Sequence, residues 1–141
     1  LVTLNTPGSD QVKADAIVQL ALVVDVSFGE EAAALCELLR AQRIFDRIVE
    51  LIDHPEPLIH QTALLLLGNL STEAVDPNSE LTKERFKQID GFSKLIPHLF
   101  SDQALTVAYA LGAIQNTCTD IEYVAKMQQL GAIVRLQDLI Q

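Results

Sequence analysis

The chain repeats itself at a spacing of 47 residues, and this repeat constrains its fold more than any other feature. The stretches that align at this spacing are residues 11–25, 58–72 and 105–119. In them Ala16, Ala63 and Ala110 fall in one column, and apolar residues recur at a 4-4-3 spacing. That spacing places the apolar side chains on one face of an α-helix. The sequence therefore predicts three copies of one long helix.

Two further segments complete each copy. A short apolar element precedes the long helix, as Leu1-Val2, Ile48-Val49 and Leu95-Ile96, and a third segment follows it at residues 30–42, 79–89 and 120–130. Pro and Asp residues, which stop or cap helices, separate the segments. The last copy is shorter, and its period falls to 41. We predict an all-α single domain over 1–141 with repeat units 1–47, 48–94 and 95–141, and a kink or late helix start at Pro97.

This three-helix unit resembles the armadillo repeat, whose period is roughly 40 to 47 residues. The strings that carry the resemblance are GAIVRLQDLI (131–140), DGFSKLIPHLF (90–100), ALLLLGNLS (63–71) and ALGAIQNTC (110–118). HEAT repeats share the period but use two helices, so the third segment favours armadillo. The resemblance implies a right-handed α-solenoid whose long helices line a concave groove for a partner segment.

The sequence starts and ends inside the second helix of a unit. Because solenoids normally need polar capping repeats, we expect a slice of a longer array or a piece of a larger assembly. The alternative is that the N-terminal helix caps the stack by itself.

Candidate groove residues lie opposite the buried stripe of each long helix, at 100° per residue. They are Asp15, Leu22, Asp25, Leu58, Thr62, Leu65, Asn69, Leu105, Tyr109, Gly112 and Asn116. The resemblance places Asn69 and Asn116 where an amide would bond a partner's main chain, although Leu22 stands there in the first copy. The alternative is that both amides only cap or cross-link neighbouring helices.

The importin-α-like subfamily adds a groove Trp four residues before each Asn. Leu65 and Gly112 occupy those places, and the chain has no Trp, which argues against capture of classical nuclear signals. Asp15 and Asp25 remain able to attract a basic ligand. Because the groove is otherwise apolar, we expect an amphipathic partner segment.

The charge balance of 10 Lys and Arg against 19 Asp and Glu excludes the basic footprint of a nucleic-acid-binding protein. A local basic group, formed by Lys83, Arg85, Lys87 and Lys94, is either a solvated face or a docking site for an acidic partner. The longest apolar runs, such as Ala63 to Leu67, have five residues, against the roughly 18 of a membrane-spanning helix. No transmembrane segment is therefore expected.

Cys36 and Cys118 form no CxxC motif, and His54, His60 and His98 lack the spacing of metal ligands. We therefore expect no cofactor or metal, and a reducing compartment, the cytoplasm or nucleus. An organelle stays open, because the sequence begins at Leu1 rather than at a Met with a visible targeting signal.

No nucleophile and base, paired carboxylates or phosphate loop occur at a catalytic spacing, so the chain is not expected to be an enzyme. The function expected is a protein–protein scaffold or adaptor that binds an extended or amphipathic segment. One alternative is a structural subunit of a large complex, held by its open ends and outer faces. A further alternative, an armadillo-type small-GTPase regulator or transport adaptor, rests on family analogy alone.

Overall fold

The computed structural model describes residue 4 and residues 8–140, and every regular element in them is a helix. The all-α prediction is confirmed for this part of the chain. The elements are α2 (Asp10–Val26), α3 (Gly29–Ala41), α4 (Ile44–Leu51), α5 (Pro57–Leu70), α6 (Ser79–Gln88), α7 (Gly91–Leu95), the 3₁₀ segment η1 (Ile96–Phe100), α8 (Ala104–Thr117), α9 (Glu122–Gln129) and α10 (Ala132–Ile140). The predicted short element at Leu1-Val2 lies outside the described residues.

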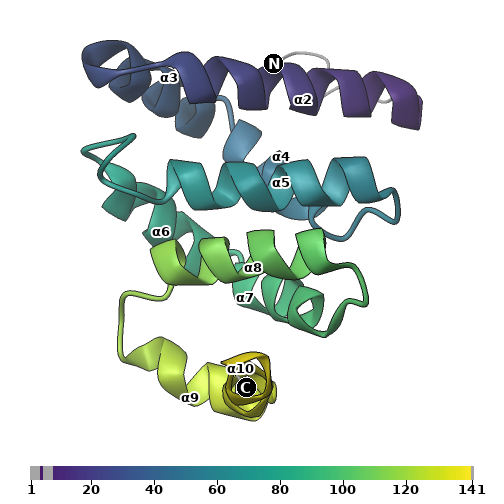
Figure 1. Cartoon of the computed structure of the whole chain (residues 1–141). Helices are drawn as coiled ribbons and strands as arrows, with labels where there is room; N and C mark the ends of the chain where they lie inside the picture. The colour runs from purple at the N-terminus through teal and green to yellow at the C-terminus, as the bar shows by residue number, and fades with distance from the viewer. Residues whose placement is uncertain (1–3, 5–7, 141) are drawn as a thin grey trace.

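The long helices α2, α5 and α8 lie side by side in one row, with α5 between the other two (Figure 1). They begin at Asp10, Pro57 and Ala104, so each starts 47 residues after the one before. Pro57 suits its place at the start of α5, because the first helical residue needs no backbone N–H donor. The long helices thus form one layer of the molecule.

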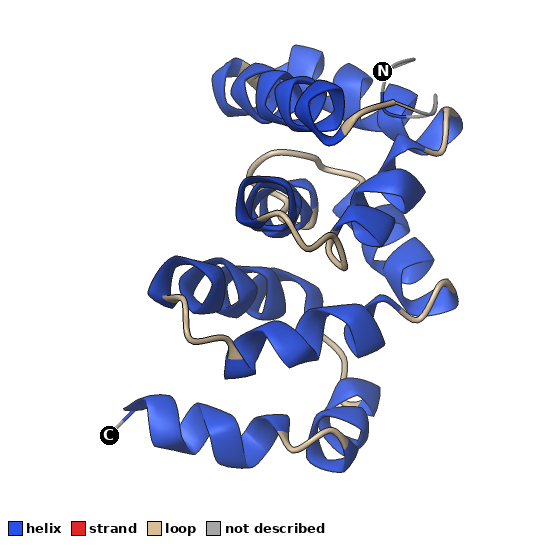
Figure 2. Cartoon of the chain, turned by 90° about the vertical axis from the view of Figure 1, so that its right-hand side faces the viewer, coloured by secondary structure: helices blue, strands red, loops and turns tan. Residues whose placement is uncertain are grey.

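The shorter helices form a second column beside the long ones (Figure 2). Helix α4 packs on α5, and both α7 and η1 pack on α8. Around Pro97 the α-helix gives way to a 3₁₀ segment, since α7 ends at Leu95 and η1 continues to Phe100. Proline lacks an N–H and clashes with the preceding turn, which is the physical reason for the change in geometry.

A single hydrophobic cluster fills the space between the two layers. Its members come from both layers, for example Leu64 and Leu67 from α5, Ile48 from α4 and Leu95 from α7, and all four are fully buried. Burial of side chains of this size contributes about 1.5–3 kcal/mol each. The apolar stripes of the helices therefore hold the layers together.

Left-handed residues precede three of the short helices. Arg43 (φ 58°), Asp90 (φ 53°) and Gly131 (φ 73°) stand immediately before α4, α7 and α10. The steps between them are 47 and 41 residues. Glycine adopts this conformation without steric cost, whereas Arg43 and Asp90 adopt it against their own preference.

The outer side of α2 has no helix packed on it among the described residues. Val12 and Val23 are about half exposed, whereas Ile59 and Leu70, which lie 47 residues later in α5, are buried. At the other end of the row, Val134 and Ile140 of α10 are also exposed. Both ends of the helical row therefore present apolar side chains.

Candidate functional site

The exposed face of the long helices carries a row of leucine side chains. Leu22 of α2, Leu58 and Leu65 of α5, and Leu105 of α8 are 55%, 51%, 36% and 50% exposed. Buried neighbours on the same helices, such as Leu64 and Leu67, hold each helix against the core. The fold thus presents these four leucines outward, as expected for candidate groove residues.

Thr62 does not belong to this exposed face. It is buried, and its hydroxyl donates a hydrogen bond of 2.6 Å to the carbonyl of Leu58 one turn earlier in α5. The prediction that Thr62 is exposed was wrong, because α5 is covered on more than one side by α2, α4 and α8. Thr62 is therefore removed from the candidate site.

A hollow of about 130 Å³ lies between α5 and α8, and we call it the α5–α8 hollow. Its lining consists of Leu64, Leu65, Gly68, Asn69, Ala108, Tyr109, Gly112, Ala113, Gln115 and Asn116. Small residues leave the space, because a Cβ atom added at Gly112 would meet no other atom within 4 Å. The hollow brings together five of the predicted groove residues, from two helices.

The two asparagines of the hollow differ in their contacts. Asn116 donates its amide N–H to the carbonyl of Gly68 at 2.8 Å, which links α8 to the last turn of α5. Asn69 is half-buried, and its side-chain amide has no hydrogen-bond partner within the described residues. Asn116 therefore has a structural contact of the kind considered as the alternative, whereas the Asn69 amide can still bond an incoming main chain.

The part of the face contributed by α2 is acidic and apolar. Asp15 and Asp25 are exposed, and neither side chain forms an ion pair with a cation in the part of the chain that the structure describes. Gln11 donates a hydrogen bond of 2.9 Å to Asp15 within the same helix. Asp15 and Asp25 therefore give this end of the face a negative charge beside Leu22.

The four residues of the local basic group do not form one free patch. Lys83 pairs with Glu80 in its own helix, and Arg85 binds Asp46 of α4 through two hydrogen bonds of 2.9 and 2.6 Å. The remaining pairs are Lys87 with Glu122 and Lys94 with Asp53. The prediction missed these partners because each of the last three pairs joins residues far apart in the sequence.

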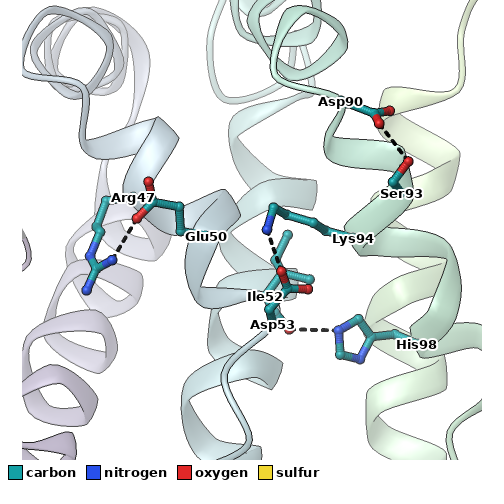
Figure 3. A network of polar contacts seen from close by, with 8 residues as sticks. All are labelled: Arg47, Glu50, Ile52, Asp53, Asp90, Ser93, Lys94 and His98. Carbon is teal, nitrogen blue, oxygen red and sulfur yellow. Dashed lines mark hydrogen bonds and ion pairs between the residues drawn. The ribbon is translucent and has the colours of Figure 1, made fainter.

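Three histidines that lack metal spacing in the sequence meet in space. The rings of His60 and His98 lie 5.1 Å apart, and Nδ1 of His60 is 2.9 Å from the carbonyl oxygen of His54. His98 donates Nε2–H to the carbonyl of Ile52 at 2.7 Å, beside the Lys94–Asp53 pair (Figure 3). Burial lowers the pKa of His98, so this ring is neutral at neutral pH.

Neither cysteine has the setting of a nucleophile. Burial raises the pKa of Cys118, whose Sγ lies 3.1 Å from Sδ of Met127. Burial and the nearby Asp76 carboxylate raise the pKa of Cys36 to about 11. Both side chains are therefore neutral thiols near pH 7, the less reactive form.

Among the described residues no group of three or more His, Cys, Asp or Glu side chains is arranged to hold a metal ion. None of the described helices is both long and apolar enough to cross a lipid bilayer. No family model, curated protein or solved structure shows a significant match to the chain. The described residues thus form an all-helical structure with exposed leucines on its long helices.

Proposed function

We propose that this chain is a non-catalytic scaffold of armadillo-like repeats that binds an extended or amphipathic segment of a protein partner. The observation that carries this proposal is the row of exposed leucines on α2, α5 and α8. Contiguous apolar surface on a folded protein marks an interaction site, because its exposure to water is unfavourable. A row of stacked helices supplies an extended surface of the kind that repeat proteins use for binding.

The α5–α8 hollow supports specific recognition at the centre of this face. Its volume of about 130 Å³ is large enough for one aliphatic side chain of a partner, which would lie between Leu65 and Tyr109. The unpaired Asn69 amide at its edge can donate to and accept from a main chain at the same time. An apolar hollow with one convergent amide is a small version of a typical ligand site.

Charge narrows the partner further. Asp15 and Asp25 are the residues of the predicted face that carry a charge at neutral pH, and this face contains no Lys or Arg. Opposite charge improves association rate and specificity. The proposed partner segment therefore combines aliphatic side chains, for the leucine row, with Lys or Arg for the α2 end.

The test uses a photo-crosslinking residue in place of Leu65, with a matched control at the exposed Ala34 of α3. In cells that express the protein, a partner should be captured from Leu65 and not from Ala34. Against that partner, Asn69→Ala should weaken binding by about 1–3 kcal/mol, the scale of a hydrogen bond lost from a buried partner. Equal capture at both positions, or unchanged affinity of Asn69→Ala, would exclude this face as the binding site.

A second candidate function is that of a structural subunit within a large complex, contacted through the ends of the helical row. The supporting observation is the exposure of Val12, Val23, Val134 and Ile140 at these ends. Under this alternative, Val23→Asp and Ile140→Asp should prevent assembly of the native complex, measured by size-exclusion chromatography of tagged protein from cells. Asn69→Ala should assemble normally, and the reverse pattern would favour the scaffold.

A further inference from the structure

Another hollow lies away from the long helices, and arginines line it. This hollow has a volume of about 390 Å³ and is formed by α3, α4 and α6 with the turn before α4; we call it the arginine hollow. Its lining residues are Arg40, Arg43, Phe45, Asp46, Leu81, Glu84, Arg85 and Gln88. Three arginines and two acidic residues therefore contribute to the lining of this space.

A second hollow occupies the corresponding place further along the chain. It has a volume of about 230 Å³ and is lined by Lys87, Asp90, Phe92, Glu122, Tyr123 and Lys126. The first three follow Arg40, Arg43 and Phe45 by 47 residues, and the last three follow Leu81, Thr82 and Arg85 by 41 residues. Five of the six lining residues of the second hollow thus match residues that line the arginine hollow, the exception being Tyr123, which matches Thr82.

The second hollow satisfies its own charges. Lys87 forms an ion pair with Glu122, and Lys126 forms one with Asp90. The Lys126 ammonium holds the pKa of Asp90 below its ordinary value, and Glu122 raises the pKa of Lys87. Both cations that line this space therefore have an acidic partner across it.

Both acids are missing from the matching places of the arginine hollow. Leu81 stands where Glu122 would be, and Arg43 stands where Asp90 would be. Arg40 and Arg85, which match Lys87 and Lys126, pair instead with Asp76 and Asp46. The ion pairs that close the second hollow cannot form here.

Arg43 is the side chain that this arrangement leaves available. Its guanidinium forms no hydrogen bond or salt bridge with any described residue, although its charge helps Arg85 to hold the pKa of Asp46 low. Its backbone is left-handed, a conformation that Asp tolerates better than Arg and Gly better than both. An arginine kept at a costly position, with five unused donors, is suited to an external acceptor.

Leu81 supplies an apolar contact at the same place. Its side chain is 60% exposed although it lines the hollow. The buried Phe45 forms another part of the lining. A ligand that satisfies this hollow therefore needs an anionic group for Arg43 and an aliphatic group for Leu81.

We propose that the arginine hollow is a second docking site, which takes an acidic–aliphatic segment of a protein, with a carboxylate on the Arg43 guanidinium and an aliphatic side chain against Leu81. A carboxylate is the group proposed because the planar guanidinium pairs with carboxylates through two hydrogen bonds, as Arg85 does with Asp46 in the same hollow. The site is independent of the leucine face and of the function proposed for it.

The test measures fluorescence anisotropy of a short labelled peptide rich in Glu and Leu, with the full chain as binder. The same peptide with Gln in place of Glu should bind weakly. Arg43→Asp, which places an acid where Asp90 stands in the second hollow, should weaken binding of the Glu peptide at least about tenfold, because a charge-assisted bond is lost and a carboxylate that repels the peptide replaces it. Leu81→Glu, at an exposed position, should weaken it in the same way.

The matched control is Lys13→Asp, which changes the net charge by the same amount on α2, outside the hollow, and should leave binding within about twofold. Glu84→Gln removes a competing carboxylate from the lining and should strengthen binding. Equal binding of the Glu and Gln peptides, no binding of the Glu peptide, or full binding by Arg43→Asp would each overturn the proposal. Binding of a phosphoserine peptide alone would replace it with a phosphate site.

Discussion

Asp76 is a charged side chain that the fold buries completely, in the loop between α5 and α6. Its carboxylate accepts from the Arg40 guanidinium and from the backbone N–H of Asn78. Cys36 lies close enough for the negative charge of Asp76 to oppose ionisation of its thiol. A burial of this kind is tolerated because the charge is paired and hydrogen-bonded.

Because the pKa of the Cys36 thiol is raised in the folded chain, we expect a loss of stability at high pH. Its pKa is about 11 in the folded chain against 9.0 for a free thiol, so between these values the unfolded chain loses a proton that the folded chain keeps. The free energy of unfolding should therefore fall as pH rises through this window, by up to roughly 3 kcal/mol from this group. Urea unfolding at a series of pH values measures the slope.

Cys36→Ala is the control for that measurement. Its slope between pH 9 and 11 should be shallower than that of the natural chain, because the perturbed thiol is gone. Identical slopes for the two proteins would mean that burial of Cys36 does not control the alkaline transition.

We expect the substitution of Gly91 and of Gly112 by Ala to change the stability of the chain in opposite directions. A Cβ atom at Gly91 would lie 2.0 Å from the ring of the buried Phe86, whereas one at Gly112 would meet nothing within 4 Å. Gly91→Ala should destabilise the chain by about 1–3 kcal/mol through overpacking. Gly112→Ala should stabilise α8 by up to about 1 kcal/mol, the helix-propensity gain. Thermal unfolding of both variants compares the two signs directly.

At the scale of the element, helix ends are stabilised by local side chains. The hydroxyl of Ser9 accepts a hydrogen bond of 3.3 Å from the backbone N–H of Val12, in the first turn of α2. In the loop before α9, Asp120 accepts from the N–H of Glu122 in the same manner. These contacts satisfy donors that a helix leaves unpaired at its start.

Removal of the α2 cap should therefore be measurable. Ser9→Ala is expected to reduce the free energy of unfolding by about 0.5–2 kcal/mol, since an N-terminal donor loses its acceptor. Ser9→Asp should retain most of the stability, because a carboxylate also caps and favours the positive end of the helix dipole. Denaturant titration followed by circular dichroism compares the three proteins. A loss of equal size in Ser9→Asp would contradict the cap as the cause.

At the scale of the whole molecule, contacts run between neighbours along the row. α5 packs on both α2 and α8, whereas α9 packs on α10 and α10 packs on η1 at the C-terminal end. The ring of Tyr123 in α9 lies 4.2 Å from that of Phe92 in α7, and Lys126 pairs with Asp90. Local stability should accordingly be highest at α5 and lowest at the C-terminal helices.

Hydrogen exchange tests this order. Amides of α5 should exchange most slowly, and amides of α10 among the fastest within the described helices. Tyr123→Ala, which removes the contact with Phe92, should speed exchange in residues 122–140 while leaving α2 unchanged. A uniform acceleration over all helices would instead show that the chain unfolds as a single cooperative unit.

Local signals in the sequence were sufficient for the helices and for several of the exposed leucines. The starts of α5 and α8 follow from Pro57 and from the 4-4-3 apolar stripe, because capping and helix period depend on residues within one or two turns. The break at Pro97 was predicted for the same reason. Leu58, Leu65 and Leu105 were placed outward by helix geometry alone.

Contacts across the row required the tertiary structure. Three features show this: the burial of Thr62, the hydrogen bond from Asn116 to Gly68 and the contact between the rings of His60 and His98. Each depends on how one helix packs on another, which the helix period within a single segment does not predict. The arginine hollow was missed for this reason too, although a comparison of Arg43 with Asp90 at the 47-residue spacing was a signal that could have indicated it.

By itself the sequence determined that the described segments are helices and which stripe of each helix is apolar, because both depend on interactions within a few residues. Only the tertiary structure decided which cationic side chains form ion pairs within the chain and which have no partner among the described residues. Arg85 is held by Asp46, 39 residues away, whereas Arg43 has no partner in the described chain. The reason is physical: ion pairing depends on distances of a few ångströms in space, and packing of one helix on another sets those distances.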